Sequence, residues 1–276
     1  MNADTKLDEE DIVWVEKYAK EVRETFGGIF KSAATRFEDG PRLLERFQAT
    51  IDELLKVGRG RFRTVDEAHN ELCMAAAILQ NPNPKFSVLE YEPRLYGCSK
   101  SIDFCAKTPD GLTLFVDVKT IKPMPRDRWE QYQKALEEGW FPDKVKLLLS
   151  KEWLGGELWH NTFAARSRFL EYALELEQKI ADCKFQAEKI FFVLAFCGEG
   201  FYWHEDELED FVSLYFSGVH RPDDPFTKAE DKYLNEKKVS LSRTISRFAC
   251  IRRPQGEIQK KQLNWNVQSP RDPSFN

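Results

Sequence analysis

The stretch "SIDFCAKTPDGLTLFVDVKT", residues 101–120, constrains the fold more than any other part of this chain. Two short apolar runs flank the turn signal Pro109–Gly111, so the stretch predicts a β-hairpin. Asp103 interrupts the first run, and Asp117, followed two positions later by Lys119, interrupts the second. Strand interiors usually exclude charged side chains unless something compensates them. The hairpin therefore predicts a polar site built on a sheet.

The alternation of side chains along a strand indicates where these charges point. Asp117 and Lys119 share one face of the second hairpin strand, about 7 Å apart along it. Asp103 lies on the face opposite to Phe104 in the first hairpin strand. If the two strands pair with their polar faces matched, the carboxylates of Asp103 and Asp117 converge.

A third acid, Glu71, lies on a helix predicted over 65–79, whose start is indicated by the capping-box spacing of Thr64 and Glu67. Glu71 falls on the shoulder of the apolar face, so it points inward or is a partly exposed helix residue. Three inward carboxylates on a small sheet would repel one another without a cation. Carboxylates and water suit Mg²⁺ or Mn²⁺, which prefer oxygen ligands. We therefore expect Asp103, Asp117 and Glu71 to hold one or two such ions.

These residues resemble the PD-(D/E)XK nuclease superfamily, which has the restriction-endonuclease-like fold. The resemblance rests on an acid on a leading helix, an acid in the second strand, and D/E-x-K in the third strand, which here are Glu71, Asp103 and Asp117-Val118-Lys119. The core order of helix, three strands, helix and strand covers about residues 64–200. Ile102, not proline, precedes Asp103.

The D/E-x-K pattern by itself is weak evidence. It also occurs at Asp4-Lys6, Glu177-Lys179, Asp182-Lys184, Glu230-Lys232 and Glu236-Lys238. Those five copies are predicted to lie in tails or on helices, whereas Asp117 and Lys119 occupy an apolar strand. The alternative interpretation is a hairpin whose acids face solvent, with Asp117 and Lys119 as an ion pair at a strand end.

The resemblance implies a divalent-metal-dependent nuclease that hydrolyses phosphodiester bonds, with DNA as the preferred substrate, leaving a 5′-phosphate and a 3′-hydroxyl. The expected catalytic residues are Asp103, Asp117, Lys119 and Glu71. Lys119 would orient or deprotonate the attacking water, or stabilise charge on the phosphorane oxygens. The alternative function is a catalytically inactive nuclease-like module that binds a partner or serves as a scaffold.

The charge distribution bears on a nucleic-acid partner. The net charge is −5, although phosphate binding normally uses a basic surface. Residues 237–261, however, carry eight Lys and Arg residues against Glu257 alone. The candidate nucleic-acid contacts are Arg59, Arg61, Arg63, Arg243 and Arg247, and the alternative is a solvated basic strand and loop. Gln131 and Gln133 contact substrate or form a polar helix face.

The wider pattern predicts an α/β fold, with a central mixed β-sheet of about four core strands flanked by helices. We expect an N-terminal helical region at 1–60, a nuclease-like core at 61–217, and a C-terminal extension with a basic strand and a loose tail at 218–276. Strands are predicted at about 86–92, 101–107, 112–120, 189–197 and 239–252. Helices are predicted at 126–138, 162–183, 205–216 and 225–236, with two or three more within 8–57.

The sequence also indicates a compartment. No apolar run approaches the roughly 18 residues that a membrane helix needs, and the first residues are acidic, unlike a secretory signal. The six cysteines show no C-x-x-C pair and are expected to be buried thiols. We therefore expect a cytoplasmic protein without a membrane partner. The oligomeric state stays open, a homodimer being one option.

Overall fold

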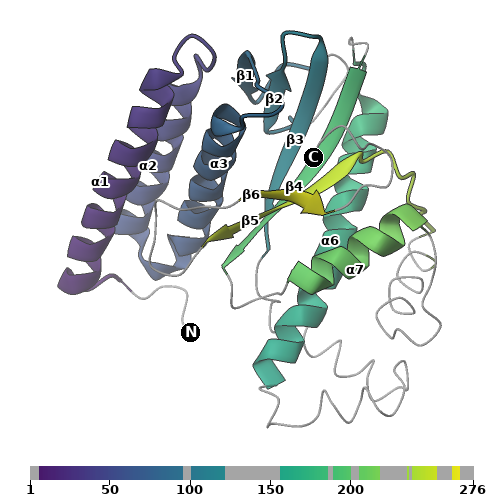
Figure 1. The fold of residues 1–276 in the computed structure, drawn as a ribbon. Helices are drawn as coiled ribbons and strands as arrows, with labels where there is room; N and C mark the ends of the chain where they lie inside the picture. The colour runs from purple at the N-terminus through teal and green to yellow at the C-terminus, as the bar shows by residue number, and fades with distance from the viewer. Residues whose placement is uncertain are drawn as a thin grey trace.

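The computed structural model describes residues 6–95, 101–121, 156–185, 189–199, 205–217, 235, 238–253 and 263–267. It confirms an α/β fold in which helices cover a mixed β-sheet (Figure 1). The helices are α1 (Glu9–Ser32), α2 (Gly40–Val57), the short 3₁₀ helix η1 (Arg59–Arg61), α3 (Phe62–Gln80), α6 (Gly156–Asp182) and α7 (Glu205–Ser217). The strands are β1 (Val88–Tyr91), β2 (Phe104–Lys107), β3 (Leu112–Thr120), β4 (Lys189–Glu199), β5 (Arg247–Arg253) and β6 (Leu263–Val267).

The described strands form one six-stranded sheet in the order β1-β2-β3-β4-β5-β6, so the four expected core strands are joined by the strand predicted in the C-terminal extension and by one more strand, β6. The pairs β1–β2, β2–β3 and β5–β6 are antiparallel, whereas β3–β4 and β4–β5 are parallel. The predicted hairpin is confirmed, because the Thr108 N–H donates to the Leu112 carbonyl at 3.0 Å and Gly111 adopts φ +89° in the turn. β6 was not predicted, since a five-residue strand with two asparagines does not stand out from a loop.

Two buried clusters occupy the two faces of the sheet. One joins α1, α2 and α3 to side chains such as Leu114 and Val116 of β3. The other joins α6 and α7 to Phe115 of β3 and Phe196 of β4. α1 and α2 therefore pack against α3, and all three helices share one core with the sheet. β5 adds a further strand to that sheet next to β4.

Of the first three α-helices, α1 and α2 have ends that follow from the local sequence. Asp8 caps α1 by accepting the Asp11 N–H at 2.8 Å. α2 begins at Gly40 with Pro41 in its first turn, and it ends before Gly58, whose φ is +105°. The capping box predicted for α3 is wrong. α3 begins at Phe62 without a side-chain cap because η1 runs directly into it, which places Thr64 inside the first turn.

The strand predicted over 239–252 is β5, and it starts later, at Arg247. The backbone before it is held by the carboxylate of Glu177 in α6, which accepts the N–H groups of Ser242 and Arg243 at 2.7 and 2.6 Å. The Tyr215 hydroxyl of α7 also donates to Glu177 and accepts the Ile245 N–H at 3.0 Å. These backbone groups bond to side chains and not to a strand, so regular pairing begins only after them.

Two further expectations meet the structure only in part. Cys73, Cys105, Cys197 and Cys250 are buried thiols as predicted, but Cys183 is disulfide-bonded, so the thiol prediction is wrong for it. Cys98, the helix predicted over 126–138 with Gln131 and Gln133, and nearly all of the helix predicted over 225–236 lie outside the described residues. Within the described ranges no helix has the length and apolarity to cross a membrane.

Glu177 should matter for stability. Glu177→Ala leaves the buried Tyr215 hydroxyl and the part-buried N–H groups of Ser242 and Arg243 without their acceptor, so we expect the free energy of unfolding to fall by about 3 kcal/mol. Urea unfolding of both proteins measures this. Gln178→Ala, one position along and exposed, is the matched control and should change stability by less than about 0.5 kcal/mol. Equal stabilities for the two variants would contradict the role assigned to Glu177.

Candidate functional site

Asp117 lies on the face of β3 that points away from α3. Its neighbours Val116 and Val118 are buried with the N-terminal helices, and Phe115 is buried with α6 and α7. The alternation predicted from the sequence is confirmed, because the Lys119 ammonium lies 3.0 Å from Asp117 Oδ2 on the same face. Asp117 is fully buried, with 0% of its side chain exposed.

Asp103 lies beside the part of β3 that carries Asp117. It directly precedes β2, whose first residue, Phe104, pairs with Val116. Asp103 Oδ2 accepts the Val118 N–H at 2.6 Å, which fixes the carboxyl group against β3. Burial and the nearby charge of Asp117 raise the pKa of Asp103 to about 6. The carboxyl group of Asp103 is therefore within electrostatic reach of Asp117.

A second lysine completes the group. Lys179 of α6 places its ammonium 2.8 Å from Asp117 Oδ1, with 10% of its side chain exposed. We call Asp103, Asp117, Lys119 and Lys179 the aspartate–lysine cluster. Burial lowers the pKa of Lys119, but the charges of Asp117 and Asp103 outweigh burial and hold it above its ordinary value. Lys119 is therefore an ammonium at neutral pH, and it lies 5.6 Å from the centre of the Tyr172 ring.

Sequence reasoning missed Lys179 because it belongs to a D/E-x-K copy that was set aside as helical. The copy is indeed on a helix, where residues two apart point in different directions. Glu177 faces the segment before β5, and Lys179 faces β3. One pattern in the sequence does indicate Lys179. Its helical spacing from Leu176 and Phe169 places it beside a stripe of buried side chains, where a lysine is unusual.

Glu71 is close to the cluster but is held by other partners. Its Oε2 accepts hydrogen bonds from Arg46 at 2.6 Å and from the Tyr91 hydroxyl at 2.9 Å, and only 9% of its side chain is exposed. Burial and the charge of Asp103, opposed by Arg46, raise the pKa of Glu71 to about 8. Glu71 is thus mostly protonated at neutral pH. The sequence did not indicate Arg46 or Tyr91, because both contacts span elements far apart in the chain.

The carboxyl groups of Asp103 and Asp117 can be compared with the ligands that a hard divalent cation prefers. Within the described ranges no group of three or more His, Cys, Asp or Glu side chains is arranged to hold a metal ion. Mg²⁺, however, is commonly bound through one or two carboxylates and several waters. Asp103 and Asp117 supply two, and Asp117 Oδ2 is buried without a hydrogen-bond partner, since the Lys119 ammonium approaches it only as an ion pair. The two aspartates fit such an ion, with Lys179 competing for Asp117.

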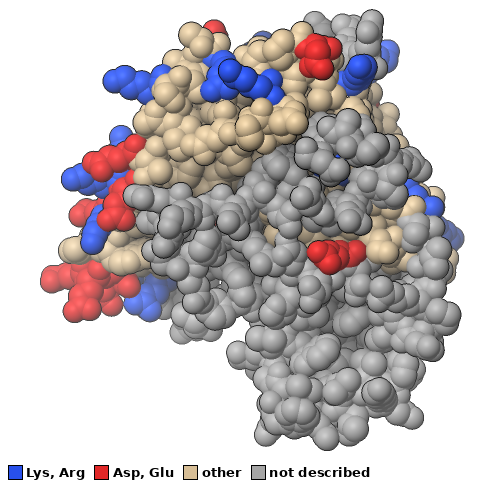
Figure 2. All heavy atoms as spheres, in the orientation of Figure 1, with Lys and Arg blue, Asp and Glu red and all other residues tan. Residues whose placement is uncertain are grey.

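The basic residues expected to contact nucleic acid are mostly paired with acids. Arg59 bonds Asp11 at 2.5 Å, and the nearest acidic atoms to Arg61 and Arg63 are on Glu53 at 2.8 Å and Glu67 at 3.8 Å. Figure 2 shows acidic and basic groups alternating along the edge that α1 occupies in Figure 1. At the other end of the chain, the Arg243 side chain is exposed and Arg247 is buried in β5.

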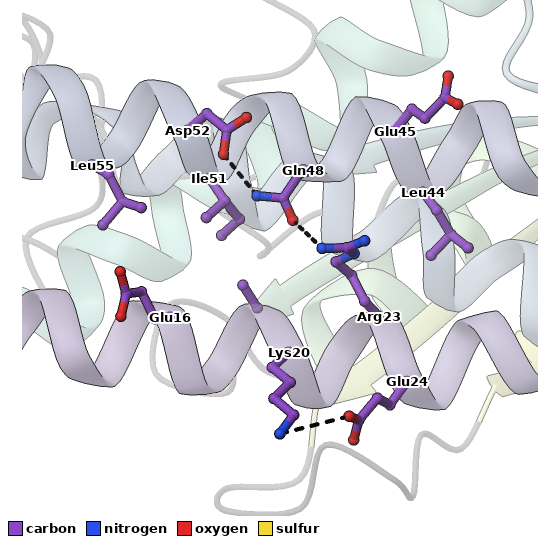
Figure 3. Close-up of a pocket in the computed structure, with 11 residues that line it drawn as sticks. Glu16, Lys20, Arg23, Glu24, Leu44, Glu45, Gln48, Ile51, Asp52 and Leu55 are labelled. Carbon is purple, nitrogen blue, oxygen red and sulfur yellow. Dashed lines mark hydrogen bonds and ion pairs between the residues drawn. The ribbon is translucent and has the colours of Figure 1, made fainter.

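A groove of about 770 Å³ lies between α1 and α2 (Figure 3). Its floor includes Ile51 and Ala19, and a chain of hydrogen bonds links Arg23 to Gln48 at 2.9 Å and Gln48 to Asp52 at 2.7 Å. None of the residues that line it belongs to the aspartate–lysine cluster or was predicted from the sequence as a site residue. The groove therefore adds nothing to the candidate site.

Comparison with known proteins leaves the chemistry of this site as the main guide to function. No family model, no curated protein and no solved structure matches the chain.

The raised pKa values of Asp103 and Glu71 predict how stability depends on pH. In the folded state the pKa of Asp103 is raised from its ordinary value of 3.8 to about 6, and that of Glu71 from 4.5 to about 8. Between the two pKa values of each group, the folded state holds a proton that the unfolded state has released. The free energy of unfolding should therefore fall as pH rises through this range, and between about pH 6 and 8 the fall comes from Glu71. Thermal unfolding of the wild type and of Glu71→Gln at pH 6 and 8 measures it.

Glu71→Gln keeps an acceptor for Arg46 and Tyr91 and cannot ionise, so its melting temperature should fall less than that of the wild type between the two pH values. Glu21→Gln, an exposed carboxyl on α1, serves as the control and should follow the wild type. Parallel curves for the wild type and Glu71→Gln would show that Glu71 is ionised in the folded protein.

Proposed function

We propose that this protein is a divalent-metal-dependent nuclease that hydrolyses phosphodiester bonds in DNA. One observation carries the proposal: the buried carboxylate of Asp117, one oxygen of which has no hydrogen-bond partner, lies beside Lys119 and within electrostatic reach of Asp103. A buried pair of acids costs free energy unless cations compensate the two charges. The resemblance to the PD-(D/E)XK superfamily assigns these same residues to a metal-dependent site.

The order of elements supports a restriction-endonuclease-like fold for the proposed nuclease. Among the described elements, α3, β1, β2, β3, α6 and β4 occur in the order helix, three strands, helix and strand, which is the core order of that superfamily. In this assignment α1 and α2 precede the core, and β5 and β6 extend its sheet.

The side chains divide the work in the following way. Asp103 and Asp117 hold Mg²⁺ or Mn²⁺, which when bound polarises the scissile phosphate and makes a coordinated water more acidic. Because Lys119 is protonated, it stabilises the negative charge that develops on the phosphorane oxygens and does not serve as a general base. Glu71 lies outside the direct ligands while Arg46 and Tyr91 hold it. Arg59, Arg61, Arg63, Arg243 and Arg247 remain the proposed contacts to nucleic acid.

A second candidate function is a catalytically inactive module with the same fold. Two observations favour it: each oxygen of Asp117 faces an ammonium group, and the described part of the chain has no group of three or more side chains arranged to hold a metal ion. In such a module the aspartate–lysine cluster would be a structural ion-pair network. Metal binding and cleavage separate the two candidates.

Cleavage assays test the proposal directly. Purified protein with Mg²⁺ or Mn²⁺ is incubated with linear, circular and single-stranded DNA, and wild-type cleavage should require the divalent ion. Lys119→Met should lower the rate by at least about 100-fold, since it removes charge stabilisation in the transition state. Lys107→Met on β2, which removes an exposed lysine paired with Glu90, is the matched control and should cut like the wild type.

The aspartate needs a charge-balanced variant. Asp117→Asn alone leaves two buried ammonium groups with the single carboxylate of Asp103, which should lower the free energy of unfolding by about 3–5 kcal/mol. A loss of activity in this variant could then not be separated from unfolding. The double variant Asp117→Asn, Lys179→Met keeps Asp103 with Lys119 and should fold without cutting. Metal-dependent cleavage at wild-type rates by this variant or by Lys119→Met would refute the nuclease assignment, and absence of both cleavage and metal binding in the wild type would favour the inactive module.

A further inference from the structure

Asp117 lies between two lysines that come from different elements. Its two oxygens face two ammonium groups, Lys119 at 3.0 Å and Lys179 at 2.8 Å, inside a site where the carboxylate is fully buried. The D/E-x-K pattern supplies only Lys119. The role of Lys179 therefore has to be argued from its place in the cluster.

We infer that Lys179 is a built-in counter-ion, which is bound to Oδ1 of Asp117 and must withdraw for a divalent ion to bind this carboxylate. The inference rests on the proposed function, because it concerns the same metal site. It makes Lys179 a residue that sets metal affinity and not one that acts on the substrate.

The charges of the cluster support this assignment. Two aspartates and two lysines balance, so the cluster is electrically complete without a metal ion. A divalent ion that bound Asp117 with Lys179 in place would add two positive charges within a few ångströms of an ammonium group in a buried site. Such repulsion is strong where the effective dielectric constant is low. Binding therefore requires Lys179 to leave.

The geometry indicates that Lys179, and not Lys119, is the one that leaves. Lys119 is anchored on β3 two residues from Asp117 and lies over the Tyr172 ring. Lys179 comes from a different element, near the last residue of α6, so its withdrawal does not involve β3. Glu175 is exposed one turn earlier on the same helix, at the i, i+4 spacing that lets it receive the displaced ammonium.

Calorimetric titration with Mn²⁺ tests the inference on the full chain. Lys179→Met should bind Mn²⁺ about tenfold more tightly than the wild type, because the competing charge is gone. Lys179→Arg keeps the charge and should bind no more tightly than the wild type. Lys107→Met removes a lysine outside the cluster and should match the wild type.

The outcomes separate this inference from the proposed function. If the wild type and Lys179→Met bind Mn²⁺ equally, and the double variant Asp117→Asn, Lys179→Met does not bind, the metal site stands and the counter-ion role is overturned. If neither the wild type nor Lys179→Met binds Mn²⁺, both proposals fail.

A second measurement avoids substitutions, so it holds even if Lys179→Met does not fold. In the wild type, the ¹⁵N signal of the Lys179 ammonium is followed by NMR during titration with diamagnetic Mg²⁺. Withdrawal from Asp117 should shift this signal and speed its hydrogen exchange, while the Lys107 signal stays unchanged. A Lys179 signal that stays unchanged at saturating Mg²⁺ would overturn the inference.

Discussion

The burial of the Asp117 carboxylate in the middle of the sheet is the constraint on which the candidate site depends. A fully buried charge is tolerated only when neighbouring groups compensate it, and here the ammonium groups of Lys119 and Lys179 do so, while the charge of Asp103 opposes it. Each of these neighbours comes from a different place in the fold. Asp103 arrives through the hairpin register, Lys119 through alternation along β3, and Lys179 through the crossover helix α6.

The layered architecture explains why these groups can meet. α6 is the described helix between β3 and the parallel strand β4, and it packs on the face of the sheet that carries Asp117. The same helix fixes the segment before β5 through Glu177, so one helix supports both the site and the entry of the next strand. On the opposite face, Arg46 of α2 and Tyr91 of β1 hold the carboxyl group of Glu71, the third acid, which comes from α3.

The protonation states divide the site into two parts with different chemistry. Lys119 stays charged because the attraction of two aspartates exceeds the effect of burial, so its role is electrostatic. Glu71 stays mostly protonated at neutral pH because burial and the charge of Asp103 outweigh the pull of Arg46. A cation at the aspartates would favour ionisation of the nearby carboxyl groups, which links metal binding at this site to proton release.

The sequence by itself determined the hairpin, the helices of the N-terminal region and the facing of Asp103, Asp117 and Lys119, because turn chemistry and side-chain periodicity are local properties. It did not reveal β6, the late start of β5 or the true start of α3, since these depend on strand partners, on Glu177 and on the preceding 3₁₀ turn. Only the tertiary structure decided that Lys179 reaches Asp117 and that Glu71 is bound by Arg46 and Tyr91. Those contacts join residues more than 19 positions apart, and their formation depends on how helices cross the sheet, which no local pattern encodes.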